Sequence, residues 1–152
     1  MIINKTDNYY LIKIQNTEIN IYDPQTLEEL TKKIIKKINK NNKLYNSIHL
    51  EFYQNNNYGI IIKLTDYKSP FKINNEKAVK ITIHPDTLFL YQIDYFDINE
   101  YNLSKDKIYY YRNKFYLQIN NNIKTKDYYK LLEISEIIYN DTDQILNKGI
   151  KI

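Results

Sequence analysis

The spacing of apolar residues predicts strands over much of the chain, because apolar and polar positions alternate with a period of two. The predicted strands are Tyr9–Ile14, Ile19–Tyr22, Ser47–Tyr53, Tyr58–Leu64, Ala78–His84, Ile108–Tyr111 and Phe115–Ile119. Short polar segments at 54–57 and 112–114 separate two pairs of these strands. These segments predict two β-hairpins.

One helix is predicted from strong local signals in the first half. Asp23 is a suitable N-cap residue, and Pro24 suits the first helical position. An apolar stripe follows at spacings of three and four residues, formed by Leu27, Leu30, Ile34 and Ile38. Glu28 and Lys32 have the spacing of an ion pair on one helical face.

Three further helices are predicted in the second half. The segment from Pro85 to about Phe96 is interpreted as a helix, although its aromatic and β-branched residues also allow an extended conformation. A second helix is predicted over about Thr125–Tyr139. Asp141 has the position of an N-cap for a last short helix, which Gly149 would end.

The segment Lys68–Lys77 has no sustained period and contains a Ser-Pro step, so it is the predicted boundary between two halves. Residues 1–68 then form a ββαββ subdomain and residues 77–152 a βαββαα subdomain. This order predicts an α+β fold, in which two small subdomains pack antiparallel hairpins on helices.

Composition limits what residue abundance can mean in this chain. Ile, Asn, Lys and Tyr make up 86 of the 152 residues, and all four have codons composed largely of A and T. Abundant lysine and tyrosine can therefore reflect base composition, so only local departures from this background are informative.

Several classes of chemistry lack the residues that they need. The chain has no cysteine, and its glycines, Gly59 and Gly149, are too far apart for a phosphate-binding loop. His49, Glu51 and His84 do not have a zinc-site spacing. We therefore predict no catalytic, cofactor-binding or metal-binding residues, and no enzymatic activity. Without a long apolar run or a signal-peptide pattern, we expect a cytoplasmic protein with no membrane partner.

A basic cluster on the first predicted helix suggests one binding function. Its candidate contacts are Lys33, Lys36, Lys37 and Lys40. These lysines could neutralise phosphates, and Tyr109–Tyr111 could stack on bases. The formal net charge is only +4 and the chain contains a single arginine, both unusual for a dedicated nucleic-acid binder. Single-stranded nucleic-acid binding is therefore an alternative function, and not the favoured one.

The clearest departure from the background is an acidic, aromatic segment at 85–104, which contains no lysine. We predict that its partner-binding residues are Asp94, Asp97, Glu100, Tyr91, Tyr95 and Tyr101. Aromatic side chains supply contact energy at interfaces, and charges supply orientation. The segment therefore indicates a docking surface for a basic protein, with a core helix that has an acidic outer face as the alternative.

Short motifs in both halves resemble those of a known family. In the first half they are Tyr22-Asp23, Glu28-Glu29-Leu30 and Gly59-Ile60-Ile61-Ile62. In the second half they are Ile108-Tyr109, Arg112-Asn113-Lys114, Phe115-Tyr116-Leu117, Leu131, Ile134-Ser135-Glu136 and Leu146-Asn147-Lys148-Gly149. Together these motifs resemble the MecA-type adaptor proteins of Gram-positive bacteria, which present substrates to a Clp AAA+ unfoldase.

The resemblance implies that the first half holds a client protein and the second half contacts the unfoldase, with Asp94, Asp97 and Glu100 in the docking face. The leading hypothesis is therefore a non-enzymatic adaptor, which makes capture of a client effectively intramolecular. The alternative is a small inhibitor or accessory protein, of phage or mobile-element origin, that blocks one macromolecular target.

Overall fold

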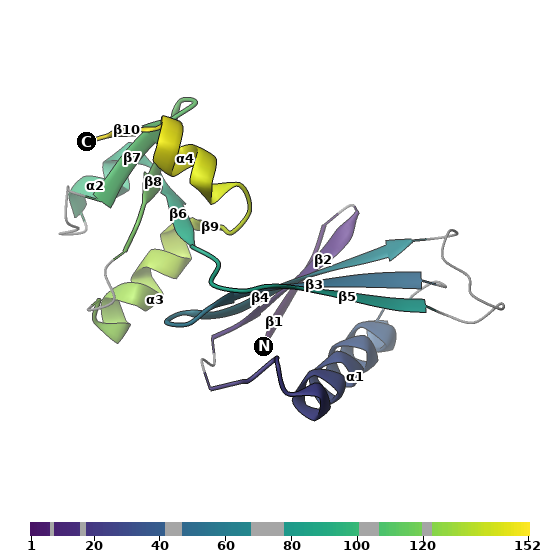
Figure 1. Ribbon diagram of the computed structural model, residues 1–152. Coiled ribbons are helices and arrows are strands. Elements are labelled where there is room, and N and C mark those ends of the chain that lie inside the picture. The colour runs from purple at the N-terminus through teal and green to yellow at the C-terminus, as the bar shows by residue number, and fades with distance from the viewer. Residues whose placement is uncertain (7, 16–17, 42–46, 68–77, 101–106, 120–122) are drawn as a thin grey trace. The chain divides into compact units, whose positions relative to one another are not determined.

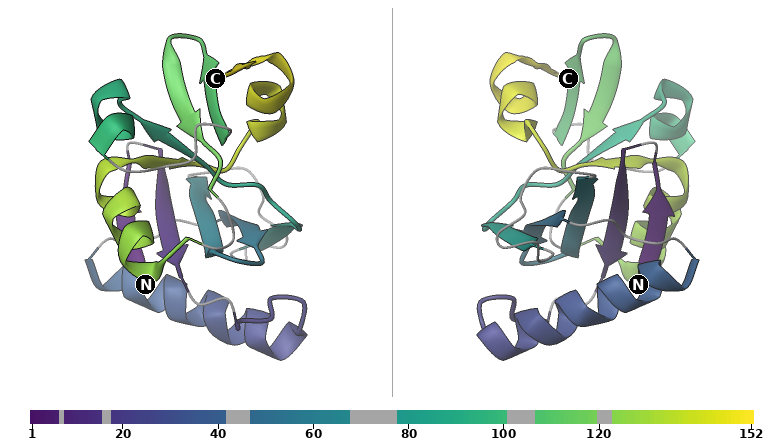
Figure 2. Two further views of the ribbon diagram at one scale, coloured as in Figure 1. Left: turned by 90° about the vertical axis from the view of Figure 1, so that its left-hand side faces the viewer. Right: turned by 90° about the vertical axis from the view of Figure 1, so that its right-hand side faces the viewer.

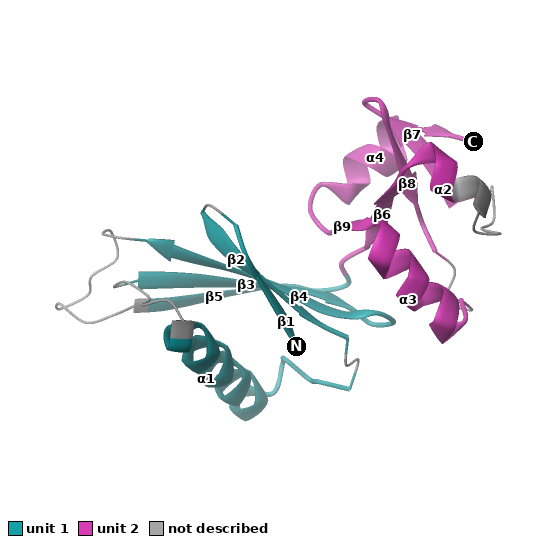
Figure 3. Ribbon diagram, turned by 180° about the vertical axis from the view of Figure 1, so that it is seen from behind, with its two compact units in different colours: residues 1–86 teal, residues 87–152 magenta. Residues whose placement is uncertain are grey.

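The computed structural model describes residues 1–6, 8–15, 18–41, 47–67, 78–100, 107–119 and 123–152. It divides into two compact units, Met1–Asp86 (unit 1) and Thr87–Ile152 (unit 2), shown in Figure 3. Each unit has its own five-stranded sheet and its own helices. The predicted α+β fold class is confirmed.

Unit 1 is a sheet with one long helix against one face (Figures 1 and 2). Its elements are β1 (Ile2–Lys5), β2 (Tyr9–Ile14), α1 (Pro24–Asn41), β3 (Ser47–Asn55), β4 (Gly59–Tyr67) and β5 (Ala78–His84). The strand order is β1-β2-β4-β3-β5. All neighbours are antiparallel except β3 and β5, which run parallel.

Helix α1 begins where the local signals predict. The Asp23 carboxylate accepts hydrogen bonds from the backbone N–H of Thr26 at 3.1 Å and from its hydroxyl at 2.6 Å. These bonds satisfy an N–H that has no partner within the helix, and they lower the pKa of Asp23. The ion pair of Lys32 with Glu28 also forms, at 2.8 Å. The predicted N-cap is confirmed.

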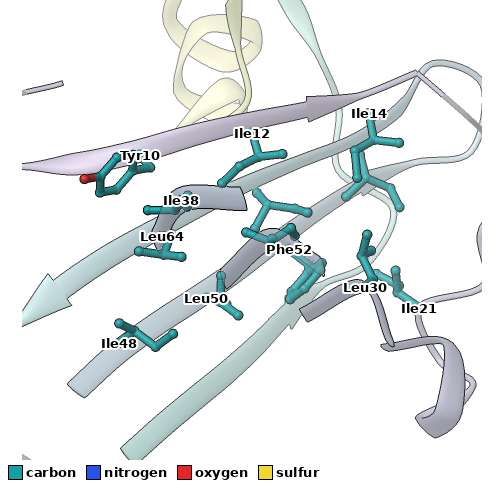
Figure 4. Packing of buried hydrophobic residues seen from close by; sticks show 13 residues of the cluster. Tyr10, Ile12, Ile14, Ile21, Leu30, Ile38, Ile48, Leu50, Phe52 and Leu64 are labelled. Carbon is teal, nitrogen blue, oxygen red and sulfur yellow. The ribbon is translucent and has the colours of Figure 1, made fainter. Parts of the chain in front are cut away.

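The core of unit 1 lies between α1 and alternate residues of the strands (Figure 4). Leu50 faces Leu64 and Phe52 faces Ile62 across β3 and β4, and all four side chains are fully buried. Burying a side chain of this size contributes about 1.5–3 kcal/mol. The apolar stripe of the helix is therefore matched by a strand pattern with a period of two.

Gly59 sets the turn between β3 and β4. Its φ is +105°, a backbone angle that residues other than glycine rarely adopt. A Cβ atom at this position would lie 2.1 Å from the carbonyl oxygen of Ile14 in β2. On the other side of the turn, the Asn55 side chain accepts hydrogen bonds from the backbone N–H groups of Asn57 and Tyr58. A residue without a side chain therefore allows β2 to approach the hairpin closely.

Unit 2 has helices on both faces of its sheet. Its elements are β6 (Leu90–Ile93), α2 (Tyr95–Glu100), β7 (Ile108–Tyr111), β8 (Lys114–Leu117), α3 (Thr125–Ile134), β9 (Glu136–Ile138), α4 (Thr142–Lys148) and β10 (Ile150–Lys151). The strand order is β10-β7-β8-β6-β9. Leu90 packs with Ile145 of α4, whereas Tyr91 bonds to Tyr128 of α3. Successive strand residues point to opposite faces, so α3 and α4 cover different faces.

The structure divides the chain at a different place from the predicted boundary. Lys68–Lys77 lies outside the described residues, and β5, which the sequence analysis assigned to the second half, pairs with β3 in unit 1. The two units instead divide after Asp86. A parallel pair requires a long connection between its strands, so no local hairpin signal marks it.

Two predictions for unit 1 differ from the structure. Ile19–Tyr22 is not a strand, since Ile21 and Tyr22 form a turn in which the Asn20 side chain accepts a hydrogen bond from the Tyr22 N–H. Asparagine side chains favour such turns over strand pairing. Strand β1 is present although the sequence analysis did not predict it.

Two predicted helices of unit 2 are wrong in part. Within Pro85–Phe96, residues Leu90–Ile93 form β6, and the helix begins only at Tyr95, so the extended alternative applies to the first part. The helix predicted over Thr125–Tyr139 ends at Ile134, and 136–138 pair with β6. In both segments the pairing of distant strands decides the conformation.

The last helix of unit 2 forms where predicted, with a different cap. Asp141 precedes α4 in a left-handed conformation, and its side chain makes no capping hydrogen bond. At the other end, the N–H of Gly149 donates to the carbonyl of Ile145 at 2.8 Å. The predicted end of the helix is confirmed, whereas the predicted role of the Asp141 side chain is wrong.

Candidate functional site

The start of α2 carries two aromatic side chains on the surface of unit 2. Phe96 is 82% exposed and Tyr95 is 57% exposed. The backbone N–H of Asp97 donates to the carbonyl of Asp94 at 3.0 Å, which turns the chain from β6 into the helix. Asp94 precedes Tyr95 and Asp97 follows Phe96, so acidic groups flank both rings in sequence. The Asp94 side chain is exposed and that of Asp97 is half-buried.

Aromatic residues of the β7–β8 hairpin continue this surface. The Tyr95 ring lies 5.5 Å from that of Phe115, which lies 5.1 Å from that of Tyr110. Tyr110 and Phe115 are directly opposite each other in the hairpin. We define the aromatic–acidic surface as Asp94, Tyr95, Phe96, Asp97, Tyr110 and Phe115. Sequence analysis did not select Phe96, although it lies within the acidic, aromatic segment, and it considered Tyr110 only for stacking on bases. Phe115 was missed because the pairing of β8 with β6, which places it next to the start of α2, is not visible in the local pattern.

The other predicted docking residues have different placements. Tyr91 is fully buried, and its hydroxyl lies 3.0 Å from that of Tyr128. The prediction that Tyr91 contacts a partner is therefore corrected: it is a core residue of unit 2. The side chain of Glu100 and the whole of Tyr101 lie outside the described residues.

The predicted basic cluster lies on the solvent side of α1. Its four lysines are all exposed: Lys33, Lys36, Lys37 and Lys40. Lys36 and Lys40, with Ile35 and Asn39, line a shallow surface depression. The structure thus brings these lysines together on one helix. Tyr109–Tyr111 belongs to the sheet of unit 2, so the two parts of the proposed nucleic-acid surface fall in different units.

A polar cluster occupies the face of the unit 1 sheet opposite α1. The parallel pairing of β3 and β5 brings together both histidines and Glu51. His84 Nε2 lies 3.4 Å from one carboxylate oxygen of Glu51, and His49 Nδ1 lies 3.9 Å from the other. Tyr53 donates to Glu51 at 2.9 Å and stacks on the His84 ring at a centroid distance of 4.3 Å.

Burial and neighbouring charges shift the pKa values in this cluster. Burial lowers the pKa of His49, Glu51 opposes that effect, and the charges of Lys80, His84 and Lys63 add to it. Burial also raises the pKa of Glu51, but hydrogen bonds from Tyr53 and His84, together with the charges of His49 and Lys63, outweigh it, so the net pKa is lowered. The arrangement favours an ionised Glu51 beside a neutral His49.

The second nitrogen of the His49 ring, Nε2, lies 2.8 Å from the Thr82 hydroxyl. Both ring nitrogens of His49 therefore face polar partners within the sheet. Among the described residues, no group of three His, Cys, Asp or Glu side chains is placed to hold a metal ion. The contacts of the cluster thus link β3 to β5.

No protein-family model, curated protein or solved structure matches the chain. Within the part of the chain that the structure describes, no helix is both long and apolar enough to cross a membrane.

Proposed function

We propose that this chain is a non-enzymatic protein-binding adaptor that docks a basic partner on the aromatic–acidic surface of unit 2. The observation that carries the proposal is the exposure of Phe96, 82%, beside Tyr95 and two aspartates. Clustered exposed aromatic side chains are typical of interfaces. The resemblance to MecA-type adaptors makes a Clp AAA+ unfoldase the first partner to test.

The energetics of the surface support this proposal. Burying an exposed ring such as Phe96 against a partner contributes about 1.5–3 kcal/mol, which is enough for an interface hot spot. Asp94 and Asp97 would repel acidic surfaces and orient basic ones. Rings therefore supply affinity and carboxylates supply selectivity.

The division into two units supports bridging of two partners. Each unit has its own sheet and core, so each can present a surface of its own. When one chain holds both a client and an unfoldase, the second binding event becomes intramolecular and gains a high effective concentration.

The test is calorimetric titration of a purified Clp ATPase with the full chain and with variants that change the surface. We expect Phe96→Ala, or Asp94→Lys with Asp97→Lys, to weaken binding by about tenfold or more. The matched control is Asp127→Lys with Asp143→Lys, which makes the same charge change at exposed positions of α3 and α4.

Equal loss in the control and surface variants would show a non-specific charge effect and contradict the proposal. If the unaltered chain does not bind the Clp ATPase, this ATPase is excluded as the partner. In copurification from the native host, an adaptor recovers an ATPase with diverse clients. Recovery of one stoichiometric partner would instead support the inhibitor alternative.

The exposed lysines of α1 favour single-stranded nucleic-acid binding as a second candidate. It predicts that the affinity for an oligonucleotide falls steeply with added salt and is lost when Lys33, Lys36, Lys37 and Lys40 are changed to Glu. A binding isotherm that does not change with salt would exclude it.

A further inference from the structure

Strand β5 ends the sheet of unit 1 and is unusually regular for an edge strand. It pairs with β3 without interruption from Ala78, opposite Ser47, to His84, opposite Tyr53. The strand contains no bulge and no proline, and Pro85 directly follows its last residue. No described strand lies along its other edge. Edges of this kind have backbone N–H and C=O groups positioned to pair with another strand.

The apolar layer of unit 1 continues onto β5 and stays open there. Val79 is opposite Ile48 and Ile81 is opposite Leu50, so both point to the same side of the sheet as the buried core. Val79 is nevertheless 48% exposed and Ile81 38% exposed. A strand added beside β5 would cover both side chains with its own apolar residues.

Charge indicates the chemistry of that added strand. On the opposite side of β5, between Val79 and Ile81, Lys80 is exposed. Unit 1 contains 13 lysines and 9 acidic residues, whereas unit 2 has 9 basic and 9 acidic residues. The whole net positive charge of the chain therefore belongs to unit 1, which disfavours a second copy and favours an acidic occupant.

We propose that the outer edge of β5 binds an extended, acidic segment of a partner protein by strand addition. Backbone hydrogen bonds supply affinity, apolar residues at alternate positions cover Val79 and Ile81, and an acidic residue on the other face pairs with Lys80. This inference concerns unit 1 alone and does not rest on the aromatic–acidic surface.

The test is fluorescence anisotropy of the full chain with a labelled peptide of the length of β5 in which Val and Glu alternate. Two control peptides are used: one with Lys in place of Glu, and one with an N-methyl group on every backbone amide, so that neither edge of the peptide can donate hydrogen bonds. We expect the N-methylated peptide to bind at least about tenfold more weakly, because it cannot complete the backbone hydrogen bonds.

A charge exchange then locates the peptide on the strand. Lys80→Glu should weaken binding of the Glu peptide by about fivefold and reverse the preference, so that the Lys peptide binds more tightly. Lys5→Glu on β1, the strand at the opposite edge of the same sheet, makes the same charge change at an exposed position and should leave the preference unchanged. Val79→Ser with Ile81→Ser should weaken both peptides, and hydrogen exchange should show protection gained in β5.

Equal binding of the N-methylated peptide would overturn strand addition. An unchanged preference in Lys80→Glu would overturn the assigned position. A dimer in light scattering that becomes a monomer in the Val79→Ser, Ile81→Ser variant would show that a second copy occupies the edge. The Asp94→Lys, Asp97→Lys variant should bind the Glu peptide normally, which keeps this test separate from that of the proposed function.

Discussion

Tyr91→Phe tests whether the acidic segment is divided between core and surface as the structure indicates. The substitution keeps the buried ring and removes only the hydroxyl that lies 3.0 Å from the Tyr128 hydroxyl. The two rings meet edge to face at 6.1 Å, an arrangement that phenylalanine preserves. The variant therefore tests what the Tyr91 hydroxyl contributes between β6 and α3.

The expected cost is about 1 kcal/mol, the net value of one hydrogen bond between neutral groups. For a domain of the size of unit 2, a loss of this size lowers the melting temperature by roughly 4–8 °C. Tyr95→Phe is the matched control, since Tyr95 is 57% exposed. Its effect on stability should stay within about 0.5 kcal/mol.

The assay is thermal and urea unfolding followed by circular dichroism, with hydrogen exchange to assign the change to unit 2. Partner binding is measured on the same samples below the melting temperature. Tyr91→Phe should lower stability and leave binding unchanged. An unchanged stability together with weakened binding would refute the placement of Tyr91 in the core and return it to the docking surface.

Two further predictions concern unit 1. Gly59→Ala should destabilise the chain by about 1–3 kcal/mol in urea unfolding, because alanine is strained at a φ of +105° and its Cβ would collide with the Ile14 carbonyl; a loss below 0.5 kcal/mol would contradict the close approach. As the pH falls through about 6.5, the unfolded chain takes up a proton at His49 before the folded chain does, because burial lowers the folded pKa, so stability should decrease on acidification. His49→Gln should reduce this slope between pH 8 and pH 5.5, and an unchanged slope would exclude His49 as its source.

The parts of the fold that sequence predicts well are those set by neighbours along the chain. Helix α1 begins at Pro24 because the Asp23 side chain can accept a hydrogen bond from the N–H of Thr26, three residues later. The apolar residues of its stripe recur about once per helical turn. The β3–β4 hairpin likewise follows from alternation on both sides of one polar turn. These signals need no knowledge of distant segments.

The parts that sequence predicts poorly depend on contacts between distant segments. The parallel pair of β3 and β5 joins residues about thirty positions apart, and no local pattern distinguishes it from another hairpin. The same pairing brings His84 to Glu51, which the spacing of these residues did not suggest. Strand β6 is recognisable only when β8 and β9 are placed on either side of it.

The candidate site shows the same limit at the level of single residues. Tyr91 and Tyr95 both lie in an aromatic, acidic segment, and composition alone assigns them the same role. In a strand, the residue at each position faces one fixed side, so the assignment of β6 places Tyr91 against α3. Tyr95 follows the strand and is exposed. The conformation of the segment therefore decides which of its rings can meet a partner.

The shape of a dose response distinguishes an adaptor, which uses two surfaces on different units, from an inhibitor, which uses one. If the β5 edge and the aromatic–acidic surface each bind a different protein, excess chain places the two partners on different copies. The amount of ternary complex then rises and falls again as the chain is added. An inhibitor that uses one surface gives an effect that saturates. Because each unit has its own core, Phe96→Ala should suppress the ternary complex without changing capture of an acidic peptide at β5. If the response to the unaltered chain saturates, bridging of two partners is excluded, whichever surface is used.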